Sequence, residues 1–339
     1  MAGWSRCPVA CEERDRTTGS SRRLLIDVHV LTRETRSGTI SGFVAIALWS
    51  TTVALARSTS EQLGPLTAAA AVYSVGGAIA LLRLSRSDQR RRGIRQVPFK
   101  YLIGCGIPFL SYMIALFLAI GLAMNHQQVL EIGLLNYLWP TLTILLSLII
   151  LKRRANLLLI PGTFLALAGI FLVLTQGSHV SWGSILDNIS ANPASYSLGL
   201  FAALSWALYS NLTRRWAGDS AQGMVDLFLP ITAIVLIVIA LLTERGQAWN
   251  LRVLLEVGFL GTVTYIAYWS WETSMRVGNF TLVTAASYLT PFFSTVVASL
   301  YLHVAPIANL WIGCGVLILG SLLSWASVVA LQDESSKHF

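Results

Sequence analysis

Aromatic side chains that carry a polar atom recur near the middle of the long apolar segments of this chain. A phenol or an indole in an apolar medium needs a hydrogen-bond partner or water, so such residues line a cavity or a contact between helices. Tryptophan and tyrosine that anchor a protein in a bilayer gather at its surfaces instead. Packing between helices is the alternative for any one of them, but their number predicts a cavity that binds a solute with an apolar or aromatic body. They are Trp49, Tyr73, Tyr112, Tyr137, Trp139, Trp206, Tyr209, Tyr265, Tyr268 and Tyr288.

Two prolines, Pro140 and Pro291, follow two of these tyrosines at the same spacing. Each proline removes one helical hydrogen bond and frees the carbonyl four residues earlier, at Asn136 or at Ser287. Inside a membrane a freed carbonyl needs protein, water or a solute as its partner. We therefore expect a helix break or hinge at each proline, with solute contact nearby and a plain kink as the alternative.

Enzyme chemistry finds no support in the sequence. The patterns H-E-x-x-H, G-x-S-x-G and the Walker A loop do not occur, so we predict that the chain is no enzyme and has no cofactor. Cys7 and Cys11 form one isolated C-x-x-x-C, which is weak evidence for a metal site, and we expect none. The carboxylates within apolar segments lie near segment ends, or one turn from a basic residue as Glu272 does from Arg276, which predicts pairing within the structure.

The elements that must position these residues are ten apolar segments. A bilayer core of about 30 Å needs roughly 20 helical residues, and 55% of the chain is hydrophobic while only 12% is charged. We predict an all-α membrane protein with ten transmembrane helices. The predicted spans are 38–57, 64–84, 98–124, 127–151, 156–176, 194–216, 223–243, 251–276, 279–302 and 308–331.

Lysine and arginine crowd into alternate connections, which orients the chain in the bilayer. The predicted arrangement is a multi-pass protein of the inner (plasma) membrane with both termini cytoplasmic. Residues 1–36 form a predicted disordered basic tail, and 332–339 form a C-terminal cytoplasmic tail. The net charge of +8 is dispersed over segment ends, so it favours contact with anionic lipid over binding of nucleic acid.

The two halves of the chain repeat each other. Because each repeat has five spans, an odd number, the second copy starts on the opposite side of the membrane, which predicts two inverted five-helix repeats, 38–176 and 194–331, around a central cavity. Such repeats suit alternating access. The glycines are predicted helix-packing positions. The matched positions are Gly42, Trp49 and Arg57 with Gly199, Trp206 and Arg214; Tyr137, Leu138 and Pro140 with Tyr288, Leu289 and Pro291; and Gly162 and Gly169 with Gly313 and Gly320.

The ten spans, the duplication and the tract that runs from Ala286 to Leu302 resemble the EamA-type branch of the drug/metabolite transporter superfamily. The tract from Leu134 to Thr143 is similar to that of bacterial aromatic amino acid exporters within the branch. This resemblance implies that spans three, four, eight and nine line the path. The substrate-binding positions it implies are Tyr112, Asn136, Tyr137, Trp139, Tyr265, Trp269, Ser287 and Tyr288, with Trp49 and Trp206 on moving helices.

We therefore predict a secondary transporter that exports aromatic or neutral amino acids by alternating access. We expect Trp49, Tyr137, Trp139, Trp206 and Tyr288 to wall the cavity, and Asn136 and Ser287 to meet the ammonium group. The alternatives are export of other small metabolites or drugs, or a passive channel with the same lining. The expected partners are a small-molecule substrate and the lipid bilayer, and we expect a monomer without nucleic acid.

Overall fold

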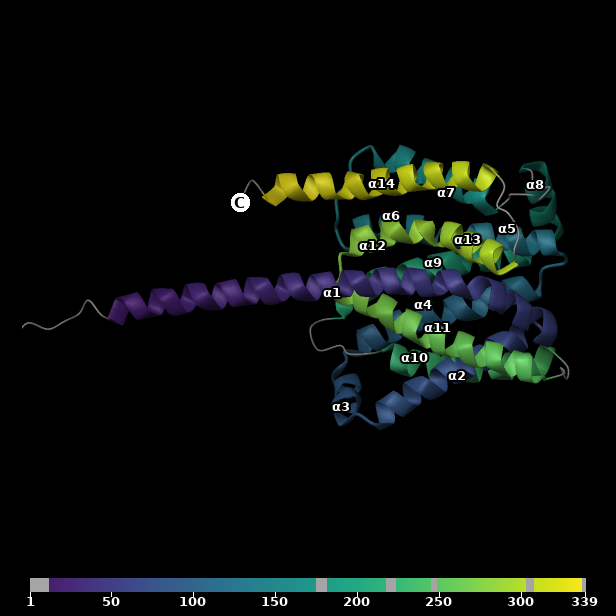
Figure 1. Cartoon of the computed structure of the whole chain (residues 1–339), viewed down its shortest axis with the longest axis horizontal. Helices are drawn as coiled ribbons and strands as arrows, with labels where there is room; N and C mark the ends of the chain where they lie inside the picture. The colour runs from purple at the N-terminus through teal and green to yellow at the C-terminus, as the bar shows by residue number, and fades with distance from the viewer. Residues whose placement is uncertain (1–11, 175–181, 218–223, 245–248, 303–307, 337–339) are drawn as a thin grey trace, which may run out of the picture.

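The computed structural model describes residues 12–174, 182–217, 224–244, 249–302 and 308–336, and throughout these ranges the regular structure is helical (Figure 1). The motif of Cys7 and Cys11 lies outside them. The elements are α1 (Glu12–Leu63), α2 (Pro65–Ser85), α3 (Asp88–Gln96), α4 (Phe99–Gly121), α5 (His126–Asn136), α6 (Trp139–Ile150), α7 (Leu159–Leu174), α8 (Trp182–Ala191), α9 (Pro193–Trp216), α10 (Val225–Thr243), α11 (Leu251–Val277), α12 (Phe280–Ala286), the 3-10 turn η1 (Ser287–Leu289), α13 (Thr290–Leu302) and α14 (Ala308–Ser336).

Six stretches in the described part of the chain are long and apolar enough to cross a membrane. They confirm an all-helical protein with several spans, while the number ten stays a prediction. Each predicted span nevertheless coincides with one helix or with a pair of helices separated by a break. The six stretches are Pro65–Ser85, Phe99–Gly121, Gln127–Ile150, Val225–Thr243, Leu251–Val277 and Trp311–Val328.

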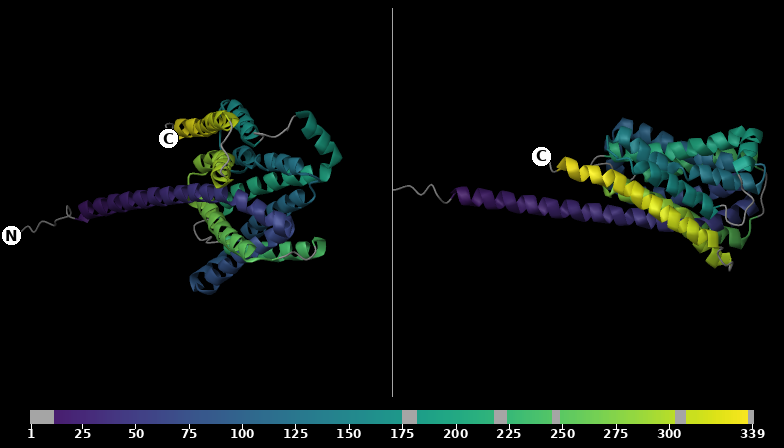
Figure 2. Two further views of the ribbon diagram at one scale, coloured as in Figure 1. Left: turned by 45° about the vertical axis from the view of Figure 1, so that its right-hand side comes forward. Right: turned by 90° about the horizontal axis from the view of Figure 1, so that it is seen from above.

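Helical structure continues into both of the segments predicted to be tails. Helix α1 begins at Glu12, inside the segment expected to be disordered, and α14 continues to Ser336. No proline lies between Glu12 and Gly38, so nothing in the backbone ends the helix before the apolar segment starts. Helices α1 and α14 extend from the same end of the bundle (Figure 2).

The predicted fourth and ninth spans are each broken in the middle. Helix α5 ends at Asn136 and α6 begins at Trp139, while η1 separates α12 from α13. Pro140 and Pro291 each occupy the second position of the helix after the break. A proline costs no hydrogen bond in the first turn of a helix, so the two prolines lie where a new helix starts rather than inside a continuous one.

The contacts between helices repeat when the two halves are exchanged. Helix α7 packs along α14, and α2 packs along α10, so equivalent helices of the two halves pair with each other (Figure 1). Helix α1 packs on α11 and α13, and the equivalent helix α9 packs on α4 and α6. Two five-helix units related by a twofold axis would produce this pattern.

The four glycines predicted to pack helices lie where α7 and α14 touch. A Cβ added at Gly162 would meet the backbone nitrogen of Ser324 at 2.7 Å, and one added at Gly169 would meet that of Leu317 at 2.5 Å. From α14, a Cβ at Gly320 would lie 2.2 Å from the Ala166 nitrogen, and one at Gly313 would be in tight contact with Leu172 and Val173 at 3.0 Å. Small residues let two helices approach closely, so this pair forms a tight brace beside the rest of the bundle.

One buried carboxylate, that of Glu272, holds a helix end in place. Glu272 of α11 accepts hydrogen bonds from the backbone nitrogens of Met224 and Val225, at 3.0 and 3.2 Å, and from the Tyr101 hydroxyl at 3.1 Å. It therefore caps the start of α10, and the predicted ion pair with Arg276 is absent from the salt bridges between described residues. The single-turn spacing suggested that pair, but the α10 backbone lies closer.

Candidate functional site

Four tryptophans from four helices meet in the interior of the bundle. Trp49 of α1 contacts Trp206 of α9, with ring centroids 5.7 Å apart, and Trp271 of α11, at 5.2 Å. Trp139, the first residue of α6, lies 5.3 Å from Trp271 and 6.3 Å from Trp206. Most pairs are edge-to-face or tilted, the arrangements that aromatic rings prefer. These four residues are called the tryptophan cluster below.

Tyrosines and a phenylalanine extend the tryptophan cluster toward α4 and α11. The ring of Tyr112 lies 4.8 Å from that of Trp206, and Tyr268 lies 5.7 Å from Trp49. Phe109 lies 5.5 Å from Tyr268. The Tyr268 hydroxyl hydrogen-bonds the Tyr73 hydroxyl at 2.8 Å, so its polar atom is satisfied.

A cavity of about 230 Å³ opens on one side of the tryptophan cluster. Its walls come from α1, α4, α5, α6, α9, α11 and α13, that is, from both halves of the chain. Every residue that lines it is uncharged, so it suits a solute without a large net charge. The lining residues are Trp49, Thr52, Tyr112, Leu116, Asn136, Tyr137, Trp139, Trp206, Tyr268 and Thr290.

A second cavity of about 150 Å³ shares Trp49, Thr52, Leu116 and Tyr268 with the first. Its other walls include Ser60, near the end of α1, and residues of the first turns of α2. The shared lining therefore leads from the tryptophan cluster toward the end of the bundle opposite to the one from which α1 and α14 extend. Together the two spaces reach the lower end of the ~300–1,000 Å³ of ordinary small-molecule sites.

Two buried oxygens on the cavity wall are poorly satisfied by the protein. Oδ1 of Asn136 and Oγ1 of Thr290 have no hydrogen bond of good geometry to any described residue, although the Tyr112 hydroxyl lies near Asn136. Asn136 is the last residue of α5, and Thr290 is the first of α13. The end of a helix carries partial negative charge and its start partial positive charge. The wall is therefore partly negative near Asn136 and partly positive near Thr290, which suits a dipolar solute.

The structure brings together six of the ten predicted binding residues and separates four. Trp49, Tyr112, Asn136, Tyr137, Trp139 and Trp206 all line the 230 Å³ cavity. Tyr288 does not, because its hydroxyl hydrogen-bonds that of Thr141 at 2.7 Å and its ring packs in a second core cluster with residues of α7 and α14. The Ser287 hydroxyl donates to the Thr284 carbonyl oxygen at 2.6 Å within its own turn.

Tyr265 and Trp269 lie nearer the end of the bundle from which α1 and α14 extend. The Tyr265 hydroxyl donates to Asp226 at 2.6 Å and accepts from Arg83 at the same distance. Asp226 also forms an ion pair with Arg90 at 3.1 Å. The Arg83 guanidinium lies 5.2 Å from the Trp269 ring centroid. These contacts join α2, α3, α10 and α11 and close the bundle here.

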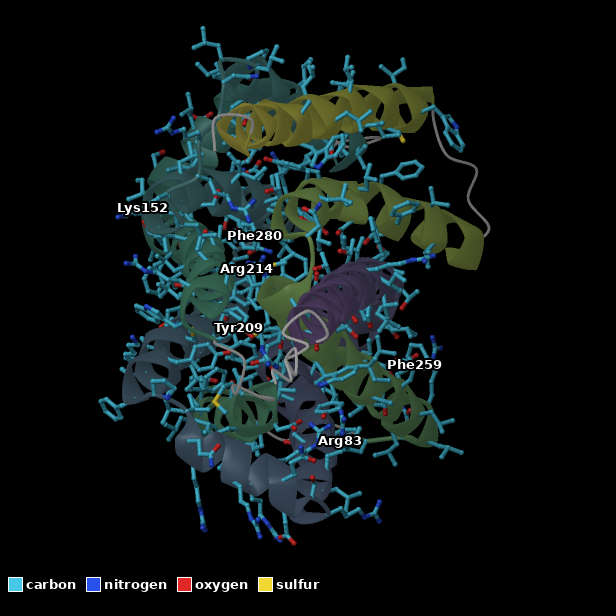
Figure 3. The ribbon with its side chains drawn as sticks, turned by 90° about the vertical axis from the view of Figure 1, so that its left-hand side faces the viewer. Arg83, Lys152, Tyr209, Arg214, Phe259 and Phe280 are labelled. Atoms are coloured by element: carbon cyan, nitrogen blue, oxygen red, sulfur yellow. The ribbon has the colours of Figure 1, made fainter. Side chains whose placement is uncertain are left out.

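A second group of arginines closes the same end of the bundle, which Figure 3 shows face on. Arg214 of α9 donates to the carbonyl oxygen of Arg276 at 2.6 Å, at the end of α11. Arg153, in the connection after α6, hydrogen-bonds Thr281, and burial together with the charge of Arg214 lowers its pKa to about 10. Arg153 therefore stays charged at neutral pH and holds the start of α12.

The binding residues predicted from the sequence include Trp269 but not Trp271. Tyr265, Tyr268 and Trp271 are spaced by three residues, so they follow one face of α11, and Tyr268 and Trp271 complete the wall around Trp49. Trp269 lies two positions from Trp271, which turns it by about 200° around the helix. The spacing from Tyr268 could have identified Trp271.

The fold and the aromatic cavity define a multi-pass helical membrane protein built from two similar halves. The model of the EamA-like transporter family matches residues 36–175 and again residues 194–326. The chain therefore belongs to the EamA-like transporter family, and it is a transporter rather than an enzyme.

Curated relatives and a solved structure cover nearly the whole length. The chain is 34% identical over 291 residues to the aromatic amino acid exporter YddG of Salmonella typhimurium, which spans 86% of this chain and 97% of the relative. The exporter of the same name from Escherichia coli gives the same values, and that of Ancylobacter novellus is 28% identical over 292 residues. A crystal structure that is 27% identical superposes with a TM-score of 0.72 and covers 87% of this chain and 99% of its own.

Tyr137 and Tyr288 occupy equivalent positions in the two halves, and the structure predicts different effects when they are changed. Tyr137→Ala removes a cavity wall, so the KM for substrate should rise about tenfold. Tyr288→Phe removes one hydrogen bond away from the cavity, which costs about 1 kcal/mol of stability, and should leave KM unchanged. Uptake into proteoliposomes over a range of substrate concentrations measures both. A raised KM in Tyr288→Phe alone would contradict the assignment.

Proposed function

We propose that the protein exports aromatic and other bulky neutral amino acids across the inner membrane by alternating access. The observation that carries the proposal is an uncharged cavity walled by tryptophan and tyrosine from both halves of the chain. The similarity to aromatic amino acid exporters over most of the sequence supports the same substrate class.

The side chain of the substrate would stack within the aromatic wall formed by Trp49, Trp139 and Trp206. Ring contacts of this kind are worth about 0.5–1.5 kcal/mol each beyond the area they bury. The ammonium group would meet Oδ1 of Asn136, at the negative end of α5, and the carboxylate would meet Thr290, at the positive end of α13. An amino acid with both charged groups would give Oδ1 of Asn136 and Oγ1 of Thr290 a hydrogen-bond partner each. A molecule with only an ammonium group or only a carboxylate would give a partner to one of them.

The proposed topology is ten spans in two inverted repeats, 38–176 and 194–331, with both termini cytoplasmic. It is supported by the exchange-symmetric helix contacts, by the two family matches and by the common end at which α1 and α14 emerge. Arginines hold that end shut, and the cavities lead toward the other. The described state thus corresponds to one closed to the cytoplasm, which a rocking of the two halves would reverse.

Counterflow in proteoliposomes tests the proposal. Vesicles loaded with unlabelled phenylalanine should accumulate labelled phenylalanine several-fold faster than empty vesicles. In a carrier, outward transport of the unlabelled substrate returns the binding site to the outside, where it takes up labelled substrate. A passive channel would show no such stimulation. Competition by each of the other amino acids defines the substrate class. Selective competition by lysine or glutamate, with none by tryptophan or tyrosine, would contradict the proposal.

A further inference from the structure

A groove of about 450 Å³ runs between α1 and α11, apart from the tryptophan cluster and its cavity. It starts close to the end of the bundle where Gly38 of α1 touches Gly278, so closely that a Cβ on Gly38 would lie 2.6 Å from the Gly278 nitrogen. The residues that line it are Arg36, Ser37, Ile40, Ser41 and Val44 of α1 and Ile266, Trp269 and Ser270 of α11.

Away from Arg36, the groove is lined by apolar side chains that no other described residue covers. Arg36, Ile40 and Val44 are spaced by four residues, so they follow one another along a single face of α1. The Ile40 side chain is 54% exposed, and Val44 and Ile266 are exposed as well. In a protein that crosses the membrane, a face of this kind is in contact with acyl chains.

The end of the groove near Arg36 and Arg83 is positively charged. Arg36 is exposed and belongs to none of the ion pairs between described residues. The Arg83 guanidinium lies against the Trp269 ring that forms part of the wall. The neighbouring carboxylate, Asp226, is already paired with Arg90 and Tyr265. Positive charge beside an open apolar channel matches an anionic head group attached to an acyl chain.

The second half of the chain lacks this combination. The offset that aligns Trp49 with Trp206 places Pro193 opposite Arg36 and Phe201 opposite Val44. In the proposed inverted topology that second face meets the outer leaflet, while the groove with Arg36 meets the cytoplasmic leaflet. The cytoplasmic surface carries the negative potential of anionic lipid, so the cation lies on the side where it has a ligand.

We propose that the groove between α1 and α11 binds an anionic phospholipid of the cytoplasmic leaflet. The lipid phosphate contacts Arg36, and one acyl chain lies along Ile40, Val44 and Ile266. The side of the membrane rests on the proposed topology, but the preference for an anionic head group does not.

Native mass spectrometry of the full-length, delipidated protein tests this site. Phosphatidylglycerol and phosphatidylcholine with identical acyl chains are titrated separately, and the ratio of bound lipid is compared. The wild-type protein should favour phosphatidylglycerol. Arg36→Gln should reduce that preference about fivefold, the value for one arginine near a lipid surface. Arg86→Gln, at the exposed end of α2 outside the groove, is the matched control and should keep the preference.

A second variant tests the apolar part of the groove separately from the charge of Arg36. Val44→Trp fills the groove where the acyl chain would lie, so it should lower the binding of both lipids at least threefold while Arg36 remains in place. The site is refuted if Arg36→Gln keeps the wild-type preference, if Arg86→Gln loses as much, or if Val44→Trp binds both lipids normally. Amino acid counterflow is a separate readout, so failure of the proposed substrate leaves this result unaffected.

Discussion

The Trp49→Ala variant is expected to transport phenylalanine at least about tenfold more slowly than the wild-type protein. Trp49 contacts Trp139, Trp206 and Trp271 and lines both cavities. The variant loses the proposed ring contact between phenylalanine and Trp49, worth about 0.5–1.5 kcal/mol, and also the packing that holds Trp139 and Trp206 in the cavity wall. A factor of ten needs 1.4 kcal/mol, which we expect the two losses to supply together. Initial rates of counterflow in proteoliposomes with matched protein content measure the effect.

Two variants distinguish a lost cavity wall from a damaged fold. Trp49→Phe keeps an aromatic ring and should retain a substantial part of the rate. Trp311→Ala removes a tryptophan that is 59% exposed on α14, so it should transport like the wild type. Equal rates for Trp49→Ala and Trp311→Ala would show that the tryptophan cluster has no part in transport.

The Glu272→Ala variant is expected to lose about 2–4 kcal/mol of stability. It leaves the backbone nitrogens of Met224 and Val225 and the Tyr101 hydroxyl without an acceptor, and an unsatisfied buried donor costs about 1–3 kcal/mol. Because Glu272 caps α10, the loss should loosen the α10–α11 contact first. Thermal unfolding of the detergent-purified protein, followed by tryptophan fluorescence, measures the shift in Tm.

Asp88→Asn supplies the control for this change. Asp88 also lies at the start of a helix, as the first residue of α3. Its side chain is 75% exposed, however, and pairs with Arg91 at the surface. Such pairs contribute less than about 1 kcal/mol, so the Tm should hardly change. Glu272→Gln keeps one oxygen acceptor and should lie between the two. A wild-type Tm for Glu272→Ala would show that the cap contributes nothing.

The long helices were predictable because the apolar character of a segment, and its length relative to the bilayer, can be read from that segment without knowledge of its neighbours. The short helix α3 was not predicted, since Ile94 is its only large apolar residue and none of its residues is fully buried. Its start is defined by Ser87, which accepts a hydrogen bond from the Arg90 nitrogen. Capping of that kind is visible in the sequence only once a helix is already suspected.

The candidate site was predictable only in part, because the direction in which a side chain points depends on packing. Internal repetition aligned Trp49 with Trp206, and in the structure their rings are in contact. The same repetition suggested equal roles for Tyr137 and Tyr288, yet Tyr137 lines the cavity while Tyr288 lies within η1 and packs among residues of α7 and α14. A one-turn change in helix type is decided by contacts between helices, which no local pattern contains.

Protection of a single cysteine by substrate shows whether the aromatic cavity is where the substrate binds. Thr52 lines both cavities, so Thr52→Cys can report on them in a chain whose native cysteines are changed to serine. A small, membrane-impermeant thiol reagent added from the outer side should label it, and tryptophan should slow labelling several-fold while lysine does not. Labelling at the same rate with and without tryptophan, in protein that still transports it, would contradict the account.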